Sequence, residues 1–481
     1  MGSARAPAGG RCAGAGRRPE RQGLITMTGV ALLGLLLAAA GGLAYGRQRF
    51  PVAFWLLFGL PLAWGRFLST YGSTMAACGL AVPPSRARAL AGWAVGRREA
   101  RPVPPRIRRL GGSMTGLRVR LRLPGGLEPA DVAAASSRLR HAWGVHAVHV
   151  VELGPGVVEL RMTCYDVLRD VRMPRRLPSG PMVVPVALRD DGTAFVRNYR
   201  EIPHALTLGA NQSGKSVYQR NLIMNLARLP VALVGIDCKG GVEQIPYAAR
   251  LSALATDREQ AAELLDTLVG EMEHRFALLK ECQRTALDSP DEEVASDIWG
   301  LPAYVRPVPV VVLVDEIAEL FLSTTKKDEE RRDRMVANLI RLAQRARAVG
   351  IYLEICGQRF GVELGKGAAT LRSQLSGRVV HRVSKQTAEV GLGDISSEAT
   401  TAATAIARDR VGVAVAGDAS GGWSHIRTPL VSIAETAAVC RAHAHLVPDL
   451  PALDRHRPSA QGEEDGPEEP GPFPRPRSGP E

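Results

Sequence analysis

The chain has 481 residues, of which 45% are hydrophobic, and this is enough for two or three domains with a large core. Residues 1–110 hold 16 Arg, no Lys and two Glu, a net charge of +14, so this segment accounts for the +13 of the whole chain and the remainder is close to neutral. Such a basic segment suits either an anionic membrane or nucleic acid. Seven cysteines are scattered with no C-x-x-C pair, which excludes a disulfide-framework protein and a zinc site of the usual spacing.

The N-terminal region has the pattern of a membrane anchor. Residues 1–22 are rich in Gly, Ala and Arg, and we expect them to be disordered. Residues 25–45 carry no charge, and a helix of this length would span about 30 Å, the thickness of one bilayer core. A second apolar stretch begins at Pro51 and can reach Tyr71 if Arg66 extends to the interface.

We therefore expect two transmembrane helices within residues 23–71, with a cleaved signal peptide as the alternative. Arginines are dense on both flanks of this pair. The positive-inside rule then predicts a two-pass protein of the cell membrane with both termini in the cytoplasm.

A linker and a small domain are expected next. Residues 72–112 are basic and rich in Pro and Arg, which indicates a linker that contacts lipid or DNA, or that is simply solvated. Residues 113–182 predict a small α+β domain with a strand at 117–123, a helix at 128–143 and a hairpin of strands at 148–152 and 157–162. Along the first strand Arg118, Arg120 and Arg122 alternate with apolar residues, as in a solvated face or a phosphate contact.

A phosphate-binding loop opens the main part of the third region, residues 183–433. An apolar run ends in Gly-x-x-x-x-Gly-Lys-Ser, and a helix-compatible segment follows. Backbone N–H groups of such a loop converge on phosphates, Lys215 reaches the outer phosphate oxygens and Ser216 can ligate Mg²⁺. A Gly-rich turn before a helix can also be purely structural. The predicted nucleotide-binding residues are Gly209, Ala210, Asn211, Gln212, Ser213, Gly214, Lys215, Ser216 and Val217.

A buried strand with two acids at its end favours the catalytic interpretation. Residues 308–314 are β-branched and apolar, and Asp315 and Glu316 follow at once. Asp315 would hold Mg²⁺, and Glu316 would polarise the attacking water. Further strands are expected at 231–236, 351–356, 378–383 and 411–415, with helices between them. The pattern predicts an α/β P-loop NTPase that hydrolyses ATP, followed at 434–481 by a short helix and a disordered tail.

Four motifs together resemble the FtsK/SpoIIIE family of DNA-pumping ATPases. They are the loop Gly209–Ser216, the strand end Ile236-Asp-Cys-Lys239, the strand end Val314-Asp-Glu316, and the strand Ile351–Cys356 with Gln358 after it. The resemblance covers about half of the chain. The overall layout is similar to the transfer proteins of actinobacterial conjugative elements.

The resemblance implies a RecA-like motor, a homo-hexameric ring that threads double-stranded DNA, and ATP sites between subunits. It implies that Gln358 senses the γ-phosphate, although a strand-end amide can also cap a turn. One arginine from the neighbouring subunit would complete each site, with Arg345, Arg347, Arg372 and Arg378 as candidates.

This chain departs from the family in two ways. It has fewer expected membrane spans, and a C-terminal winged-helix module is not evident in the sequence. Recognition of a DNA site is then expected from a partner protein or from a short segment such as residues 434–445.

The function expected from the resemblance is ATP-driven translocation of double-stranded DNA at the membrane, in conjugative transfer between cells. The alternatives are a related ATPase that drives protein secretion, a chromosome-segregation pump, and a membrane scaffold that binds ATP without hydrolysing it. DNA-stimulated phosphate release would separate the first from the others.

Overall fold

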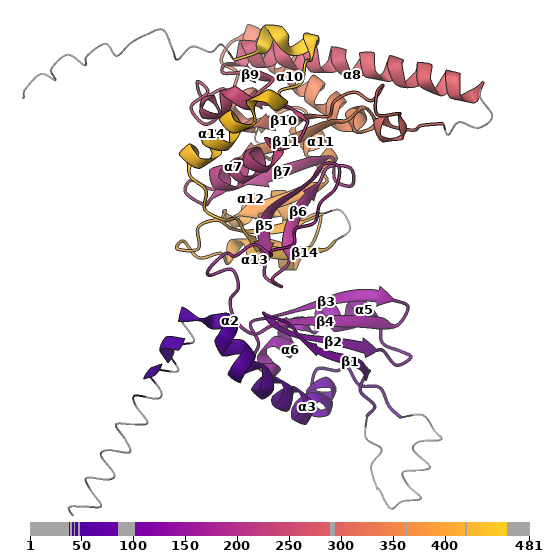
Figure 1. Cartoon of the computed structure of the whole chain (residues 1–481), viewed down its shortest axis with the longest axis vertical. Helices are drawn as coiled ribbons and strands as arrows, with labels where there is room; N and C mark the ends of the chain where they lie inside the picture. The colour runs from indigo at the N-terminus through magenta and orange to yellow at the C-terminus, as the bar shows by residue number, and fades with distance from the viewer. Residues whose placement is uncertain are drawn as a thin grey trace, which may run out of the picture. The chain divides into compact units, whose positions relative to one another are not determined.

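The computed structural model describes residues 49–84, 102–288, 294–361, 364–418 and 421–458, together with 38, 41–42 and 44–46. The chain divides into two compact units, residues 1–165 and 166–481, which are described separately below (Figure 1). The expected disordered segment 1–22 and the end of the expected tail, from residue 459, lie outside the described residues.

The first unit is a four-stranded antiparallel sheet with helices on one face. The strand order is β1-β2-β4-β3, and the alternation of apolar and arginine residues along β2 gives the sheet one buried and one exposed face. Helices α3, α5 and α6 supply the other half of the core, with Phe67, Leu139 and Trp143 almost fully buried. The bounds are α2 Pro51–Phe54, the π-helical turn η1 Trp55–Gly59, α3 Leu60–Ala77, β1 Arg106–Gly112, β2 Gly116–Arg122, α5 Pro129–Ala134, α6 Ser136–Trp143, β3 Ala147–Gly154 and β4 Val157–Thr163.

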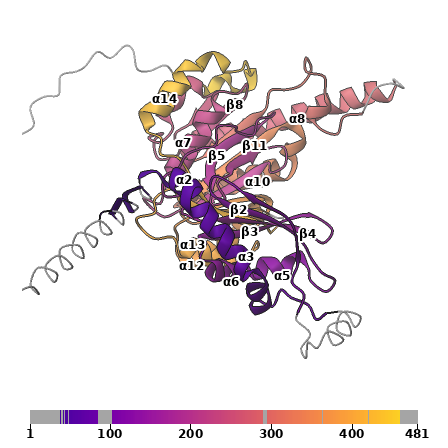
Figure 2. The ribbon, with the colours of Figure 1, turned by 60° about the horizontal axis from the view of Figure 1, so that its bottom comes forward.

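The second apolar stretch of the N-terminal region forms α2, η1 and α3, and one side of it packs on the small sheet. Trp55 donates from Nε1 to the carbonyl of Ser113 at 3.0 Å, and the Tyr71 hydroxyl donates to the carbonyl of Pro105 at 2.7 Å. Figure 2 shows α3 alongside this sheet. Among the residues that the structure describes, no helix combines the length and the apolar character that crossing a membrane requires. The first expected span, residues 25–45, lies for the most part outside them.

Two local differences from the expected pattern occur in this unit. Residues 106–112, expected to belong to the linker, form strand β1 because Ile107 and Leu110 pack against the core while the arginines between them face outward. The expected single helix over 128–143 is divided at Ala135, where the carboxyl end of α5 meets the start of α6. The capping box at Glu128 and Asp131 fixes the start of α5.

The second unit contains the predicted α/β motor fold. Within the described residues its sheet has ten strands in the order β6-β5-β14-β13-β12-β7-β11-β10-β8-β9, of which β12 to β9 are parallel and the others antiparallel. The parallel strands β7, β8, β10, β11 and β12 are buried along their whole length, as expected where helices cover both faces. The bounds of all ten strands are β5 Val183–Arg189, β6 Ala194–Asn198, β7 His204–Leu208, β8 Ala232–Ile236, β9 Ala253–Ala255, β10 Val310–Val314, β11 Ile351–Gly357, β12 Gly377–His381, β13 Val413–Gly417 and β14 Trp423–Arg427.

Helices cover both faces of this sheet. One face packs against α8, α10, α11, α12 and α13, and the other against α7, η2 and α14 (Figure 1). Asp257, Thr325 and Ser432 cap the starts of α8, α10 and α14 through their side chains. The helices are α7 Lys215–Leu226, α8 Arg258–Leu287, α9 Ile317–Phe321, α10 Lys326–Arg345, α11 Ala368–Gln374, α12 Lys385–Leu392, α13 Ser397–Thr404 and α14 Ile433–Ala442, with 3₁₀ turns η2 Ile245–Arg250, η3 Ile298–Gly300, η4 Ala346–Val349, η6 Ala444–Leu446 and η7 Pro451–His456.

The β5–β6 hairpin stands at one end of the strand order but reaches the centre of the sheet. Arg197 of β6 donates from Nε to Glu354 Oε1 of β11 at 2.8 Å, and both side chains are almost fully buried. The guanidinium also lies over the ring of Tyr199. The sheet therefore curls so that this hairpin packs over α7, and a buried ion pair joins the edge strand β6 to the interior strand β11.

Candidate nucleotide-binding site

The predicted phosphate-binding loop lies between β7 and α7, at the edge of the sheet where the parallel strands end. The Gly209 N–H donates to the carbonyl of Gly357 at 3.1 Å, which ties the start of the loop to the end of β11. Helix α7 begins at Lys215, so the N–H groups of its first turn have no partner inside the helix. A helix N-terminus that follows a glycine-rich loop is a favourable place for a phosphate.

The loop is braced from behind by a segment that is distant in sequence. Gly214 has a φ of 108°, and a Cβ at this position would lie 2.6 Å from both N and Cα of Gly412. The Gly412 N–H donates to the Ser213 carbonyl at 3.0 Å, and the Ala210 N–H donates to the Arg382 carbonyl at 3.1 Å. Glycine is thus required at 214 by the packing behind the loop as well as by backbone conformation.

His381 lies under the loop, a position that no sequence pattern indicates. It is fully buried, its Nδ1 lies 3.2 Å from the carbonyl of Val413, and its ring edge contacts Tyr218 of α7. Because a carbonyl only accepts, Nδ1 carries the proton. Burial lowers the pKa of His381 to about 4, so the ring is neutral at pH 7. It acts as a neutral packing element beneath the phosphate site.

The two predicted acids follow β10 directly, and the lysine of the loop meets them. Asp315 and Glu316 are 2% and 7% exposed. Lys215 Nζ lies 3.1 Å from Glu316 Oε2 and 3.3 Å from the backbone carbonyl of Asp315. Burial lowers the pKa of Lys215, and its acidic surroundings more than offset this, so the pKa lies above its ordinary value. Lys215 is therefore charged at pH 7.

Gln358 reaches the same place from the neighbouring strand. Its backbone N–H donates to Glu316 Oε1 at 3.0 Å. Glu316 thus joins the end of β10 to the end of β11 and holds Lys215 with its other oxygen. The role of the Gln358 side chain toward a γ-phosphate stays a prediction.

Lys239 is a site residue that the sequence reasoning did not assign. Its Nζ lies 3.6 Å from Asp315 Oδ2 and 3.7 Å from Glu316 Oε2. The turn that carries it is fixed by Asp237, whose carboxylate accepts from the N–H groups of Lys239 and Glu243 at 3.2 and 2.8 Å. The available signal was strand adjacency: β8 and β10 are parallel neighbours, so the residues that follow them must meet.

The residues present fit a hydrated magnesium ion. Asp315 Oδ1 is buried and has no hydrogen-bond partner among the described residues. Burial raises the pKa of Asp315, and Lys215 and Lys239 offset part of this effect. A carboxylate oxygen together with the Ser216 hydroxyl gives the hard oxygen ligands that Mg²⁺ takes when phosphates supply the rest. Metal binding by Ser216 and Asp315 is therefore chemically reasonable and stays a prediction.

The candidate arginines for the neighbouring subunit's site differ in availability. Arg378 is only 6% exposed, its guanidinium donates to the carbonyl of Arg372 at 2.9 Å, and burial lowers its pKa to about 10. It cannot extend to a second subunit from this position. Arg345 is exposed but bonded to Glu273 at 2.6 Å, and Arg347 is exposed and donates to the carbonyl of Arg200.

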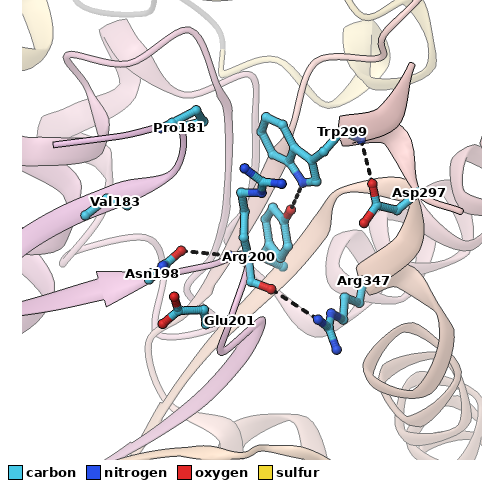
Figure 3. A pocket seen from close by; sticks show the side chains of 9 residues that line it. Pro181, Val183, Asn198, Arg200, Glu201, Asp297, Trp299 and Arg347 are labelled. Carbon is cyan, nitrogen blue, oxygen red and sulfur yellow. Dashed lines mark hydrogen bonds between the residues drawn. The ribbon is translucent and has the colours of Figure 1, made fainter. Parts of the chain in front are cut away.

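A hollow of about 360 Å³ lies at the opposite end of β11 from the phosphate loop (Figure 3). Arg200 lies over the ring of Trp299, whose Nε1 donates to the Tyr352 hydroxyl at 3.0 Å. Arg347 and Asp297 also line it, and each bonds to a neighbour within the hollow. Several of its polar groups thus bond to one another, and the hollow is separate from the nucleotide site.

Comparison with known proteins identifies relatives for both units. The family model of the actinomycete conjugal transfer protein N-terminal domain matches residues 43–164, and that of the FtsK/SpoIIIE family matches residues 167–362. Transfer protein TraSA of Streptomyces ambofaciens is 54% identical over 395 residues, which cover 82% of this chain and 95% of the relative. DNA translocase FtsK of Haemophilus influenzae is 28% identical over 306 residues, 56% of either chain. Among solved structures, the pCW3 conjugation coupling protein TcpA in its monomer form with ATPγS has a TM-score of 0.46 and 18% identity, covering 74% of this chain and 98% of that chain.

Proposed function

Because the chain belongs to the FtsK/SpoIIIE family and, within it, to the actinomycete conjugal transfer proteins, we propose that it hydrolyses ATP to move double-stranded DNA from cell to cell. The observation that carries the proposal is the meeting of Lys215, Asp315 and Glu316 at one edge of the motor sheet. A phosphate loop alone would serve any nucleotide-binding protein. A loop whose lysine touches a buried acid pair has the parts needed for hydrolysis.

Each residue has a distinct task in this proposal. The amides of residues 209–217 and the Lys215 ammonium bind the triphosphate. Glu316, held by the Gln358 N–H, orients and deprotonates the attacking water. Lys239 favours the charged form of Asp315. A bound Mg²⁺, held by Ser216 and Asp315, would neutralise phosphate charge.

We further propose a homo-hexameric ring with ATP sites between subunits. Within the described residues, the cations bonded to Asp315 or Glu316 are Lys215 and Lys239, and neither is an arginine. Phosphoryl-transfer sites commonly use an arginine to stabilise the charge of the transition state. An arginine supplied by a second copy would complete the site, and exposed Arg347 is a better donor than buried Arg378.

Membrane attachment through the N-terminal segment is also part of the proposal, with the motor in the cytoplasm. Support comes from apolar side chains on the side of η1 and α3 that faces away from the small sheet. Leu57, Leu62 and Leu68 are 70%, 73% and 55% exposed. A cluster of exposed apolar side chains on one helix is typical of a surface that meets lipid. The recognition of a DNA site is assigned to a partner protein or to a segment around α14.

Steady-state ATP hydrolysis by the full-length protein, with and without duplex DNA, tests the function. We expect DNA to stimulate phosphate release severalfold, and Lys215→Ala to abolish both basal and stimulated activity. Exposed Lys385 of α12 provides the matched control, because Lys385→Ala removes the same charge from a side chain that pairs with Glu389 and not with Asp315 or Glu316. Hydrolysis that is indifferent to DNA, or stimulated by a secretion-substrate peptide instead, would refute the proposal.

A further inference from the structure

Arginines from three adjacent strands gather on the exposed face of the small sheet in the first unit. On β2 the apolar residues Leu117, Val119 and Leu121 are at most 2% exposed, so Arg118 and its alternate neighbours must point to the other face. Residues directly opposite each other on paired strands share a face. The register therefore adds arginines from β1 and β4 to the same surface. The members of this arginine face are Arg106, Arg109, Arg118, Arg120, Arg122 and Arg161.

The arginine face carries like charges in direct opposition. Arg106 stands across from Arg122, Arg109 across from Arg120, and Arg118 across from Arg161. Like charges in such positions destabilise a sheet. A face that was merely solvated would have no need of this arrangement, whereas a bound polyanion would relieve the repulsion.

One acid organises part of the face. Glu159 has a side chain only 6% exposed, and it accepts from Nε of Arg120 at 2.9 Å and from Nε of Arg161 at 3.1 Å. Burial raises the pKa of Glu159, and these two bonds more than offset it, so the pKa lies below its ordinary value. Glu159 is thus ionised at pH 7 and fixes the two guanidinium groups. Six arginines and one acid leave a net charge of about +5 on this surface.

The exposed apolar residues of this unit show which polyanion fits. A surface that binds lipid mixes basic residues with large apolar ones. In the described part of the unit, exposed large apolar residues are Tyr45, Phe50, residues of η1 and α3, Met114 and Leu153, and none of them stands in the paired positions of β1, β2 and β4 that carry the arginines. Helix α3 packs on the buried face of the sheet, so its exposed apolar side and the arginine face point in opposite directions. If the apolar side meets lipid, the arginines face the aqueous side.

We propose that the arginine face binds the phosphate backbone of double-stranded DNA, independently of its sequence. Arginine is suited to this because its planar guanidinium donates two parallel hydrogen bonds to a phosphate. This inference rests on the proposed function, in which duplex DNA is the cargo. The face gives the protein a second DNA contact, separate from the motor and independent of ATP.

The test measures DNA affinity of the full-length protein in detergent, without nucleotide, over a series of salt concentrations. The test variant changes Arg106, Arg109, Arg118 and Arg122 to Gln and leaves the two arginines on Glu159. We expect at least a tenfold loss of affinity for a fluorescent 30-base-pair duplex at low salt. The slope of log affinity against log salt should fall in magnitude by about 3–4, since each phosphate contact contributes about 0.9.

Two matched variants keep the test decisive. The control variant changes to Gln four exposed arginines outside the arginine face: Arg138, Arg140, Arg175 and Arg176. It removes the same net charge and should bind DNA like the unmodified protein. Four Arg→Lys changes on the face should restore most of the affinity. The Gln variant should unfold at the same or a higher temperature, because repulsion is removed, and should keep DNA-free ATP hydrolysis.

Each other outcome has one meaning. Equal affinity of the face variant and the control variant would overturn the inference. If the face variant loses binding to vesicles containing phosphatidylserine while its DNA affinity is unchanged, the face binds lipid, and the inference is also overturned. Failure of the proposed function appears separately, as a lack of DNA stimulation of ATP hydrolysis by the unmodified protein.

Discussion

Glu316→Gln should have opposite effects on ATP binding and on ATP hydrolysis. In the structure Glu316 Oε2 accepts from Lys215 Nζ at 3.1 Å, with side chains 11% and 6% exposed. A phosphate that binds Lys215 must compete with this carboxylate. Removing the negative charge while keeping the shape frees the lysine, so ATP should bind more tightly even as the general base is lost.

The size of each effect follows from the contacts. A hydrogen bond to a charged group in such a site contributes about 1.5–3 kcal/mol, and in the variant an amide NH₂ replaces the oxygen that accepted from Lys215. A net gain of about 1–2 kcal/mol corresponds to ATP affinity about 5–30-fold higher. Loss of a general base lowers kcat by about 10²–10⁴-fold. The Gln358 N–H can still donate to the amide oxygen, so the fold of the site should be kept.

The measurements are ATP affinity from a fluorescent nucleotide at equilibrium and phosphate release under saturating ATP and DNA. Glu319→Gln, three residues further on at the start of α9, is the control and should change neither quantity. Hydrolysis near the unmodified rate would show that Glu316 is not the base. Affinity that is equal or weaker, with hydrolysis lost, would refute the competition for Lys215.

Three further changes test the motor in other ways. Gly214→Ala should abolish ATP binding and should lower the thermal unfolding temperature more than Gly365→Ala does. Both glycines have φ near 108°, but only at 214 would the added Cβ lie within 3 Å of backbone atoms, so equal losses would contradict this reasoning. Glu354→Leu should lower the free energy of unfolding of the motor in urea by about 3–5 kcal/mol, because it leaves Arg197 buried and unpaired. Adding Arg197→Met to the same chain should recover most of the lost free energy, and additive losses would show that the two residues are not a coupled ion pair. Lys239→Met should move the acid limb of the ATPase pH profile to higher pH, since losing a nearby cation raises the pKa of Asp315. An unmoved limb would contradict that role.

The features that sequence predicted well are those encoded within one short stretch. The phosphate loop, the β-branched run before Asp315 and the strand before Gln358 each carry their own pattern, and the structure places them at one sheet edge. Parallel order explains why: consecutive strand ends of an α/β sheet share an edge, so local motifs become neighbours without further information.

The features that sequence missed depend on contacts between distant segments. Gly412 braces the phosphate loop from about 200 residues away, and Arg197 meets Glu354 across 157 positions. Strand β1 was not predicted because its only apolar residues that pack on the core, Ile107 and Leu110, are separated by arginines, in a segment whose composition is typical of a linker. No periodicity within one segment reports such pairings, because their energy comes from tertiary packing.

Salt should separate the two roles that the chain assigns to its two units. At 0.1 M salt the screening length is about 10 Å; adding salt shortens it and weakens interactions between exposed charges, but acts much less on buried pairs. The exposed arginines of the small sheet belong to the first kind, whereas the Lys215–Glu316 pair, almost fully buried, belongs to the second. Raising salt should therefore raise the DNA concentration needed for half-maximal stimulation and leave hydrolysis at saturating DNA nearly unchanged. If the apparent DNA affinity and the hydrolysis rate at saturating DNA fell together, DNA binding and hydrolysis would depend on the same exposed charges. The separate roles of the sheet face and the motor would then be refuted.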